Sequence, residues 1–95
     1  MDFNNKVVWI TGASGGIGEH LAYAFAKQGA KLVLTARNET ELERVKQNCP
    51  SDTELLIFKM DVTDFEIIPG CAKKVIDTFG RIDILVNNAG ISQRS

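Results

Sequence analysis

Short apolar runs alternate with longer amphipathic stretches along the whole chain. The apolar runs, which we take as strands, are residues 6–10, 32–34, 55–58 and 82–86. Between them, apolar residues recur three or four positions apart, which is typical of helices that bury one face. The first run is apolar at successive positions, as expected of a strand that is covered on both faces. The pattern predicts the order β-α-β-α-β-α-β, which calls for a parallel sheet with right-handed crossovers.

The first two predicted helices begin and end at residues that favour helix ends. The first follows a glycine-rich turn and ends at Gly29, where glycine permits the left-handed conformation. Its apolar positions are Ile17, Leu21, Ala24 and Phe25. Asn38 can cap the second helix, whose inner face carries Leu42 and Val45 and which Pro50 closes. Acidic residues suit the positive end of that helix, and they are Glu39, Glu41 and Glu43.

The third predicted helix contains a proline that decides where it starts. If the helix began near Asp64, Pro69 would lie beyond the first turn, where its ring clashes with a preceding carbonyl. We therefore expect the helix to begin close to Pro69, because proline is tolerated at the first helical position. We expect it to end at Gly80. Its inner face carries Ala72, Val75, Ile76 and Phe79.

Composition places the chain among ordinary globular proteins. It has 95 residues, of which 44% are hydrophobic and 24% charged. Eleven Lys and Arg against twelve Asp and Glu give a net charge of −1, which excludes a basic nucleic-acid surface and gives no reason to expect an anionic membrane as partner. Cys49 and Cys71 lack metal-ligand spacing, so we expect no metal site and two reduced thiols in an intracellular protein.

The turn after the first strand, Thr11 to Gly18, has the composition of a phosphate-binding loop. Gly12 permits a sharp exit from the strand, Gly16 lets the backbone approach a diphosphate, and Gly18 lets the helix pack closely on the sheet. Free N–H groups and the positive end of the helix dipole then attract the anion. The alternative is a turn with a structural role only. The position of the glycine-rich turn between the first strand and the first helix favours the phosphate-binding interpretation.

Three other motifs in this region are less consistent with their usual chemistry. The match to G-x-S-x-G around Ser14 needs a downstream acid and histidine, but the only histidine is His20 on the same helix. No Gly-Lys-Ser/Thr follows the turn, so it is not a P-loop. Tyr23 and Lys27 have catalytic Tyr-x-x-x-Lys spacing, but they lie too far along the helix from the carboxyl ends of the strands. We interpret them as an amphipathic surface pair.

Residues after the second, third and fourth strands supply candidate cofactor contacts. Where an acidic residue would meet a free ribose 2′-hydroxyl, this chain has Arg37, a planar cation suited to a 2′-phosphate. This favours NADP over NAD, and the alternative is a solvated arginine that pairs with Glu39 or Glu41. Asp61 can accept a hydrogen bond from an adenine amino group or form a local turn. Asn87 and Asn88 can bridge neighbouring loops and contact ribose.

Three segments, in this order and at these separations, resemble the short-chain dehydrogenase/reductase family. They are Thr11-Gly12-x-x-x-Gly16-x-Gly18, Asp61-Val62 and Asn87-Asn88-Ala89-Gly90. The resemblance covers almost the whole chain, and residues 42–46 and 79–95 look most like the dehydrogenase/reductase member 7 branch. It implies an α/β fold with a Rossmann-type doubly wound parallel sheet: four strands ordered 3-2-1-4, with the first two of three helices on one face and the third on the other.

The resemblance also implies a function and a set of site residues. Family members transfer hydride between a nicotinamide cofactor, here NADP with NAD less favoured, and an alcohol or carbonyl carbon of a small molecule. The residues implied at the phosphates are Gly12, Ser14, Gly15, Gly16, Ile17 and Gly18. By the same resemblance, Arg37 selects the 2′-phosphate, and Asp61 and Val62 flank adenine. The residues implied on the ribose side are Asn88, Ala89 and Gly90, while Asn87 mainly stabilises the central strands.

The family's catalytic serine, tyrosine and lysine lie well beyond its Asn-Asn-Ala-Gly turn. Only residues 91–95 follow that turn here, so we expect no catalytic residue in this chain. We interpret residues 1–95 as the amino-terminal part of an NAD(P)-binding Rossmann domain from a longer enzyme, inactive by itself. The alternative is a non-catalytic nucleotide-binding or interaction module that is complete at Ser95.

The resemblance bears on assembly and location as well. In a chain of this extent the fourth strand would become an apolar edge, so we expect marginal stability and self-association, with a homo-oligomer as the result. Members of the branch tend to carry a hydrophobic amino-terminal anchor, but this chain begins a few residues before its first strand. We therefore expect an intracellular, cytoplasmic location, with association to the endoplasmic reticulum membrane as the alternative.

Overall fold

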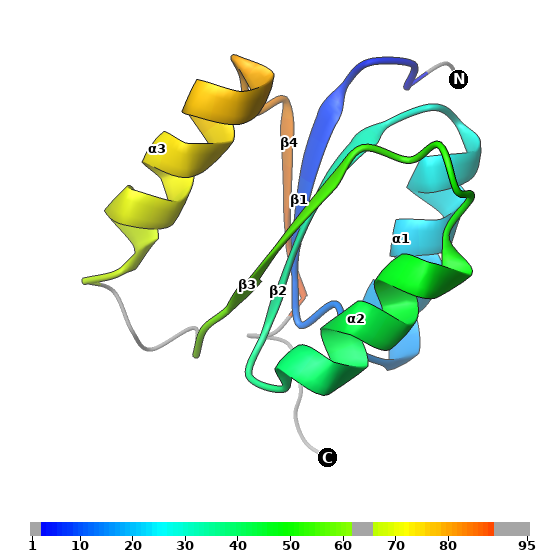
Figure 1. The fold of residues 1–95 in the computed structure, drawn as a ribbon, viewed down its shortest axis with the longest axis horizontal. Coiled ribbons are helices and arrows are strands. Elements are labelled where there is room, and N and C mark those ends of the chain that lie inside the picture. The colour runs from blue at the N-terminus through cyan, green and yellow to red at the C-terminus, as the bar shows by residue number, and fades with distance from the viewer. Residues whose placement is uncertain (1–2, 62–65, 89–95) are drawn as a thin grey trace.

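Four parallel strands form a sheet with the order β3-β2-β1-β4 in the computed structural model, which describes residues 3–61 and 66–88 (Figure 1). The strands are β1 (Val7–Thr11), β2 (Lys31–Ala36), β3 (Leu55–Lys59) and β4 (Ile84–Asn87). β1 lies between β2 and β4, so that Trp9 is in register with Val33 on one side and with Leu85 on the other. The predicted strand order is confirmed.

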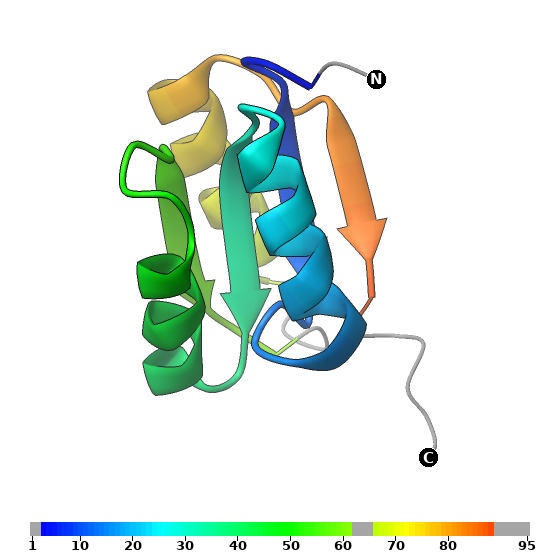
Figure 2. The same ribbon diagram turned by 90° about the vertical axis from the view of Figure 1, so that its right-hand side faces the viewer.

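Helices cover both faces of this sheet. α1 (Gly16–Lys27) and α2 (Glu39–Asn48) lie on one face, and α3 (Ile68–Phe79) lies on the other (Figures 1 and 2). This is the predicted arrangement, and it follows from right-handed crossovers out of a sheet whose strand order reverses at β1. Asn38 caps α2 as predicted, because its Oδ1 accepts a hydrogen bond from the Glu41 N–H at 3.1 Å.

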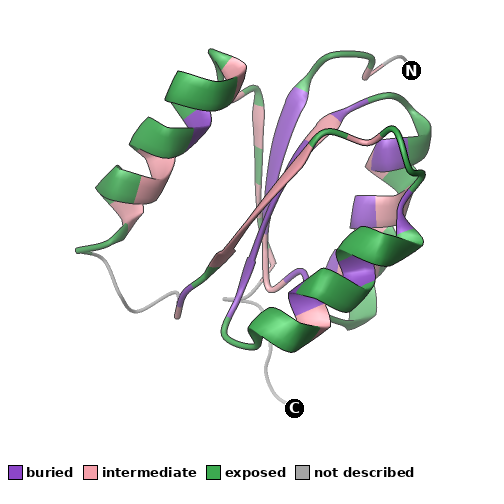
Figure 3. Ribbon diagram, in the orientation of Figure 1, coloured by how far each residue is buried: buried purple, intermediate pink, exposed green. Residues whose placement is uncertain are grey.

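Each face of the sheet contributes a separate apolar core. Alternate residues of β1 and β2 point toward α1 and α2, and these are Val8, Ile10, Leu32 and Leu34. The intervening residues Val7, Trp9 and Val33 pack toward α3, where Val75 is fully buried. Burial on both faces explains why these two strands are apolar at successive positions (Figure 3). Trp9 is a packing residue of the second core, and its indole Nε1 donates to the Thr35 hydroxyl at 3.3 Å.

The buried face of α1 differs from the one expected from its apolar spacing. Ile17 is 67% exposed and Ala24 is also exposed, while Leu21 and Phe25 are only half-buried. The buried residues are Gly18, Ala22 and Ala26. Because these side chains are small and four positions apart, they let the helix backbone approach the sheet closely, and larger side chains lie at the margins of the contact.

The start of α3 agrees with the expectation, and part of its inner face does not. The helix begins at Ile68 with Pro69 in its first turn, and it ends at Gly80, which has a φ of 83°. Val75 is buried as predicted, but Ile76 is 45% exposed. Ile76 is exposed because this helix covers its face of the sheet alone within the described part of the chain, so only a narrow stripe of it is in contact.

β4 lies at the edge of the sheet among the described residues, and its Leu85 is 62% exposed. The strand starts at Ile84, two residues later than the predicted run, because Ile82 lies in an irregular segment before it. Exposure of this apolar edge agrees with the expectation, while self-association through it stays a prediction.

Asp83, directly before β4, connects the start of that strand to β1 through a hydrogen bond. Its Oδ2 accepts a hydrogen bond from the Val7 N–H at 2.8 Å, and its Oδ1 lies 2.7 Å from Nη2 of Arg81. The backbone hydrogen bond from Val7, helped by the guanidinium of Arg81, holds the pKa of the Asp83 carboxyl below its ordinary value of 3.8. The carboxylate form is therefore the one that the fold favours.

Acid should weaken the fold through this residue. Since the folded pKa is depressed, Asp83 stabilises the protein fully above its ordinary pKa, and this contribution is lost as pH falls through the folded value. The urea midpoint should therefore fall more steeply between roughly pH 5 and 3 in the wild type than in Asp83→Asn, which stays neutral. Asp77→Asn, which removes an exposed pair with Lys73, serves as the control. Parallel pH profiles for wild type and Asp83→Asn would refute this role.

Candidate functional site

The glycine-rich turn leaves the carboxyl end of β1 in conformations that its glycines permit. Gly12 and Gly16 have φ values of 63° and 55°, in the left-handed region that favours glycine. A Cβ atom on Gly18 would collide with the carbonyl oxygen of Gly12 and come within 2.9 Å of the Asn88 Nδ2. Gly12 thus turns the chain as predicted, and the close approach at Gly18 is to the turn itself and to Asn88.

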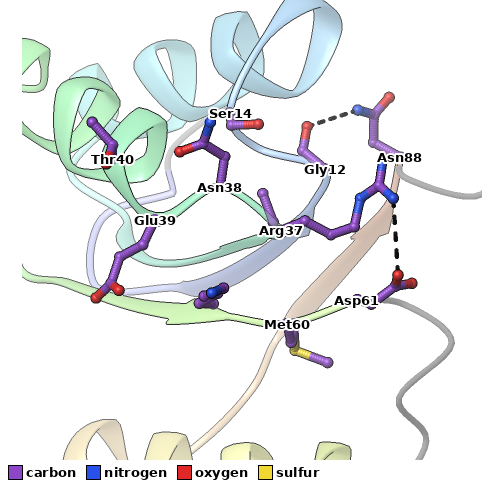
Figure 4. A pocket seen from close by; sticks show the side chains of 11 residues that line it. Gly12, Ser14, Arg37, Asn38, Glu39, Thr40, Met60, Asp61 and Asn88 are labelled. Carbon is purple, nitrogen blue, oxygen red and sulfur yellow. Dashed lines mark hydrogen bonds and ion pairs between the residues drawn. The ribbon is translucent and has the colours of Figure 1, made fainter.

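Neighbouring strands hold the first half of this turn. The Ala13 N–H donates to the Thr35 carbonyl at 3.2 Å, and the Asn88 Nδ2 donates to the Gly12 carbonyl at 3.1 Å (Figure 4). Thr11 connects β1 with β4, because its hydroxyl lies 3.2 Å from the Asn87 Oδ1. Asn88 thus bridges two loops, as the sequence predicts, and Asn87 ties β4 to its neighbour β1, in agreement with the strand-stabilising role that the resemblance implies.

An open cavity of about 1080 Å³ lies at the carboxyl ends of the strands, next to this turn. Its lining comes from the glycine-rich turn, from the ends of β2, β3 and β4 and from the start of α2. The lining residues are Gly12, Ser14, Ala36, Arg37, Asn38, Glu39, Thr40, Lys59, Met60, Asp61 and Asn88. The crevice outside the carboxyl ends of parallel strands, where the strand order reverses, is the usual ligand site of this architecture.

Arg37 extends across this cavity toward the end of β3. Its Nη1 lies 4.0 Å from the Asp61 Oδ2, and its side chain is 82% exposed (Figure 4). The partner is thus Asp61, not the Glu39 or Glu41 considered from the sequence, and Glu41 accepts a hydrogen bond from Arg44. An exposed pair at this distance is weak, so the guanidinium can exchange this carboxylate for a doubly charged phosphate.

The structure brings together five of the predicted site residues. Those on the cavity wall are Gly12, Ser14, Arg37, Asp61 and Asn88. Gly15, Gly16 and Ile17 are exposed beside it, and Gly18 is buried under the turn. Val62, Ala89 and Gly90 lie outside the described residues. The sequence reasoning missed the wall residues Asn38, Thr40, Lys59 and Met60, although their positions next to strand ends were a usable signal.

A polar network between the two helices was also missed. Arg44 in α2 donates to both carboxylate oxygens of Glu19 in α1, at 2.9 and 3.0 Å, and to the Ser14 carbonyl at 3.2 Å. Hydrogen bonds from Arg44 and then from Tyr23 lower the pKa of Glu19 to about 2. Tyr23, which the sequence assigns with Lys27 to an amphipathic surface, also belongs to this network, since its hydroxyl donates to Glu19 at 2.6 Å.

The two cysteines of the described chain lie in apolar surroundings. Cys49 is buried and Cys71 is half-buried against the α3 core, and burial raises the pKa of both thiols. A raised pKa leaves little of the nucleophilic thiolate at neutral pH. Within residues 3–61 and 66–88 there is no group of three acidic, histidine or cysteine side chains that could hold a metal ion. No helix there has the length and apolar character needed to span a membrane.

Comparison with known proteins identifies the family. The family model described as short chain dehydrogenase matches residues 6–95. The chain belongs to the short-chain dehydrogenase family. The resemblance to the member 7 branch is also confirmed, because the human protein named Dehydrogenase/reductase SDR family member 7 is 50% identical over 99 residues. That alignment covers 99% of this chain and 29% of the human protein, so the chain spans less than a third of this short-chain dehydrogenase relative.

Solved structures of the short-chain dehydrogenase family show the same fold. A metagenomic short-chain oxidoreductase in complex with NADP matches with a TM-score of 0.87 and 36% identity, over 94% of this chain and 41% of that one. An NAD⁺-bound xylitol dehydrogenase matches with a TM-score of 0.83 and 34% identity, over 90% of this chain and 33% of that one. The first of these neighbours is a complex with NADP and the second is bound to NAD⁺, so both forms of the nicotinamide cofactor occur among them.

Proposed function

We propose that residues 1–95 are the amino-terminal, cofactor-binding part of an NAD(P)-binding Rossmann domain, and that the site takes NADP in preference to NAD. The observation that carries the preference is the position of Arg37 on the cavity wall, beside the glycine-rich turn. An enzyme that selects NAD commonly has an acidic residue there for the ribose 2′-hydroxyl. A guanidinium instead offers two parallel N–H donors to a 2′-phosphate.

The described residues fit a dinucleotide in two further respects. A Cβ atom on Gly15 or Gly16 would meet no atom within 4 Å, so open space adjoins the turn where a diphosphate could approach the backbone. The start of α1 adds the positive end of a helix dipole, and the chain places no acidic residue before Glu19 there. In this proposal the diphosphate lies along residues 12–18, and Asp61 with Val62 flanks the adenine. Asn88, Ala89 and Gly90 border the ribose.

Bound NADP would supply a nicotinamide carbon that gives or accepts hydride. The residues of this chain bind and orient that cofactor, and we assign none of them to proton transfer at the substrate oxygen. We therefore propose that a longer protein containing this segment interconverts a small-molecule alcohol and carbonyl compound. We propose an intracellular, cytoplasmic protein, in line with the free thiols of Cys49 and Cys71. We also propose that it assembles as a homo-oligomer.

Calorimetry on the full-length protein tests this proposal. NADPH should bind more tightly than NADH by about tenfold or more, because one additional charge-assisted contact separates the two cofactors. The 95-residue chain alone should show no hydride transfer with any carbonyl substrate. Failure of the full-length protein to bind either coenzyme would overturn the proposed function, and turnover by the isolated chain would overturn the absence of catalytic residues from it.

A further inference from the structure

The glycine-rich turn has a fixed half and an open half. Residues 12–13 are held by β2 and by the residue directly after β4 through the two hydrogen bonds described above. Ser14 is held by α2, because the Arg44 Nη2 donates to its carbonyl at 3.2 Å. Gly15 and Gly16 are exposed, with free space where a side chain would be. The contact from Arg44 is thus the last of these anchors before the open half.

The Arg44 guanidinium is fixed in its turn by two carboxylates. It forms a two-pronged contact with Glu19 at 2.9 and 3.0 Å, and its Nε donates to the Glu41 Oε1 at 2.9 Å. The Glu19 carboxylate also accepts from the Tyr23 hydroxyl, and its side chain is only 19% exposed. Because two carboxylates compensate its charge, Arg44 adds little positive potential to the turn. Its contribution is therefore geometric, because its planar guanidinium donates to three acceptor groups at once.

We propose that Arg44 is a positioning residue that sets the glycine-rich turn for an anionic diphosphate. The identity of this ligand rests on the proposed function. In a trans peptide the carbonyl of Ser14 and the N–H of Gly15 point to opposite sides. The hydrogen bond from α2 to the carbonyl therefore turns the Gly15 N–H away from α2. The negative end of the carbonyl dipole then points toward α2, on the side opposite to the N–H. A turn that is ordered beforehand loses less entropy when the ligand binds.

Two variants of the full-length protein separate geometry from charge. Arg44→Gln removes the guanidinium, and Arg44→Lys keeps the charge but cannot reach three acceptors in different directions. Both should weaken NADPH and NADH by about 3- to 10-fold, the loss expected for one hydrogen-bonded anchor. The loss should be the same for the two coenzymes, because they share the diphosphate. Wild-type affinity in either variant, or a loss confined to NADPH, would overturn the proposal.

Hydrogen exchange without coenzyme supplies a readout that does not depend on the ligand. Amides of residues 13–17 should exchange faster in both Arg44 variants than in the wild type, while the strands keep their protection. Lys46→Gln, which removes a positive charge from the exposed side of the same helix, should leave the turn unchanged. If exchange instead rises throughout the chain or not at all, Arg44 does not position the turn. If the wild type binds neither coenzyme, the proposed function fails, and this measurement still decides the role of Arg44.

Discussion

Arg37→Asp in the full-length protein should invert or abolish the preference for NADPH. The substitution removes the cation from the cavity wall and places a carboxylate where the 2′-phosphate would lie, within reach of Asp61, the present partner of Arg37. Loss of a charge-assisted, bidentate contact alone weakens binding by roughly 10- to 100-fold, and like-charge repulsion adds to this. NADH, which presents a hydroxyl there, can donate a hydrogen bond to the new carboxylate.

The ratio of the two dissociation constants is the quantity to measure. Calorimetry with NADPH and NADH should show the ratio shifted by at least tenfold in Arg37→Asp, and by less in Arg37→Ala, which lacks the repulsion. Lys46→Asp makes the same charge reversal on α2, away from the cavity wall, and should leave the ratio unchanged. Equal losses for both coenzymes in Arg37→Asp would remove Arg37 from the specificity role.

Gly18→Ala should damage both the fold and the site. The added methyl group would collide with the backbone carbonyl of Gly12 and crowd the Asn88 amide, and a backbone atom cannot move aside as a flexible side chain can. Overpacking of this kind costs about 1–3 kcal/mol, which is a large share of the stability of a small domain. Since the turn must shift to relieve the collision, affinity for either coenzyme should fall together with stability.

Urea denaturation and calorimetry on the full-length protein measure both effects. Gly70→Ala is the matched control, because Gly70 lies exposed in α3 and a Cβ there meets no atom within 4 Å. That variant should gain about 0.5–1 kcal/mol, since alanine favours helix more than glycine does. If Gly18→Ala were as stable as Gly70→Ala and bound the coenzymes normally, close packing at Gly18 would not be required.

Local patterns predicted most of the fold. The runs around Val8 and Leu34, the cap at Asn38 and the stop at Gly80 each depend on residues a few positions apart. Errors arose where burial depends on the shape of the opposing surface. Ile17 and Ile76 have the spacing of buried residues, yet both are exposed. Ile17 lies in the first turn of α1, and Ile76 lies on α3, which covers its face of the sheet alone among the described helices.

The candidate site was predicted in part. Gly12, Arg37 and Asn88 were found because each directly follows a strand, and parallel strands bring their carboxyl ends to one edge. The ion pair between Arg37 and Asp61 was not foreseen. Nearby acidic residues of α2 were equally good partners in sequence, and only the pairing of β2 with β3 places Asp61 within reach.

The sequence by itself determined the order of the elements, their crossovers and the glycine-rich turn, because backbone preference and hydrophobic period are properties of neighbouring residues. The tertiary structure alone decided the contact from Arg44 to Ser14, across 30 residues, and the choice of Gly12, 76 residues away, as the loop residue that Asn88 contacts. Such contacts depend on how closely helix and strand backbones approach one another. Buried small residues such as Ala22 and Ala26 set that distance here. The local sequence around these residues does not indicate which side chains the close approach will bring into contact.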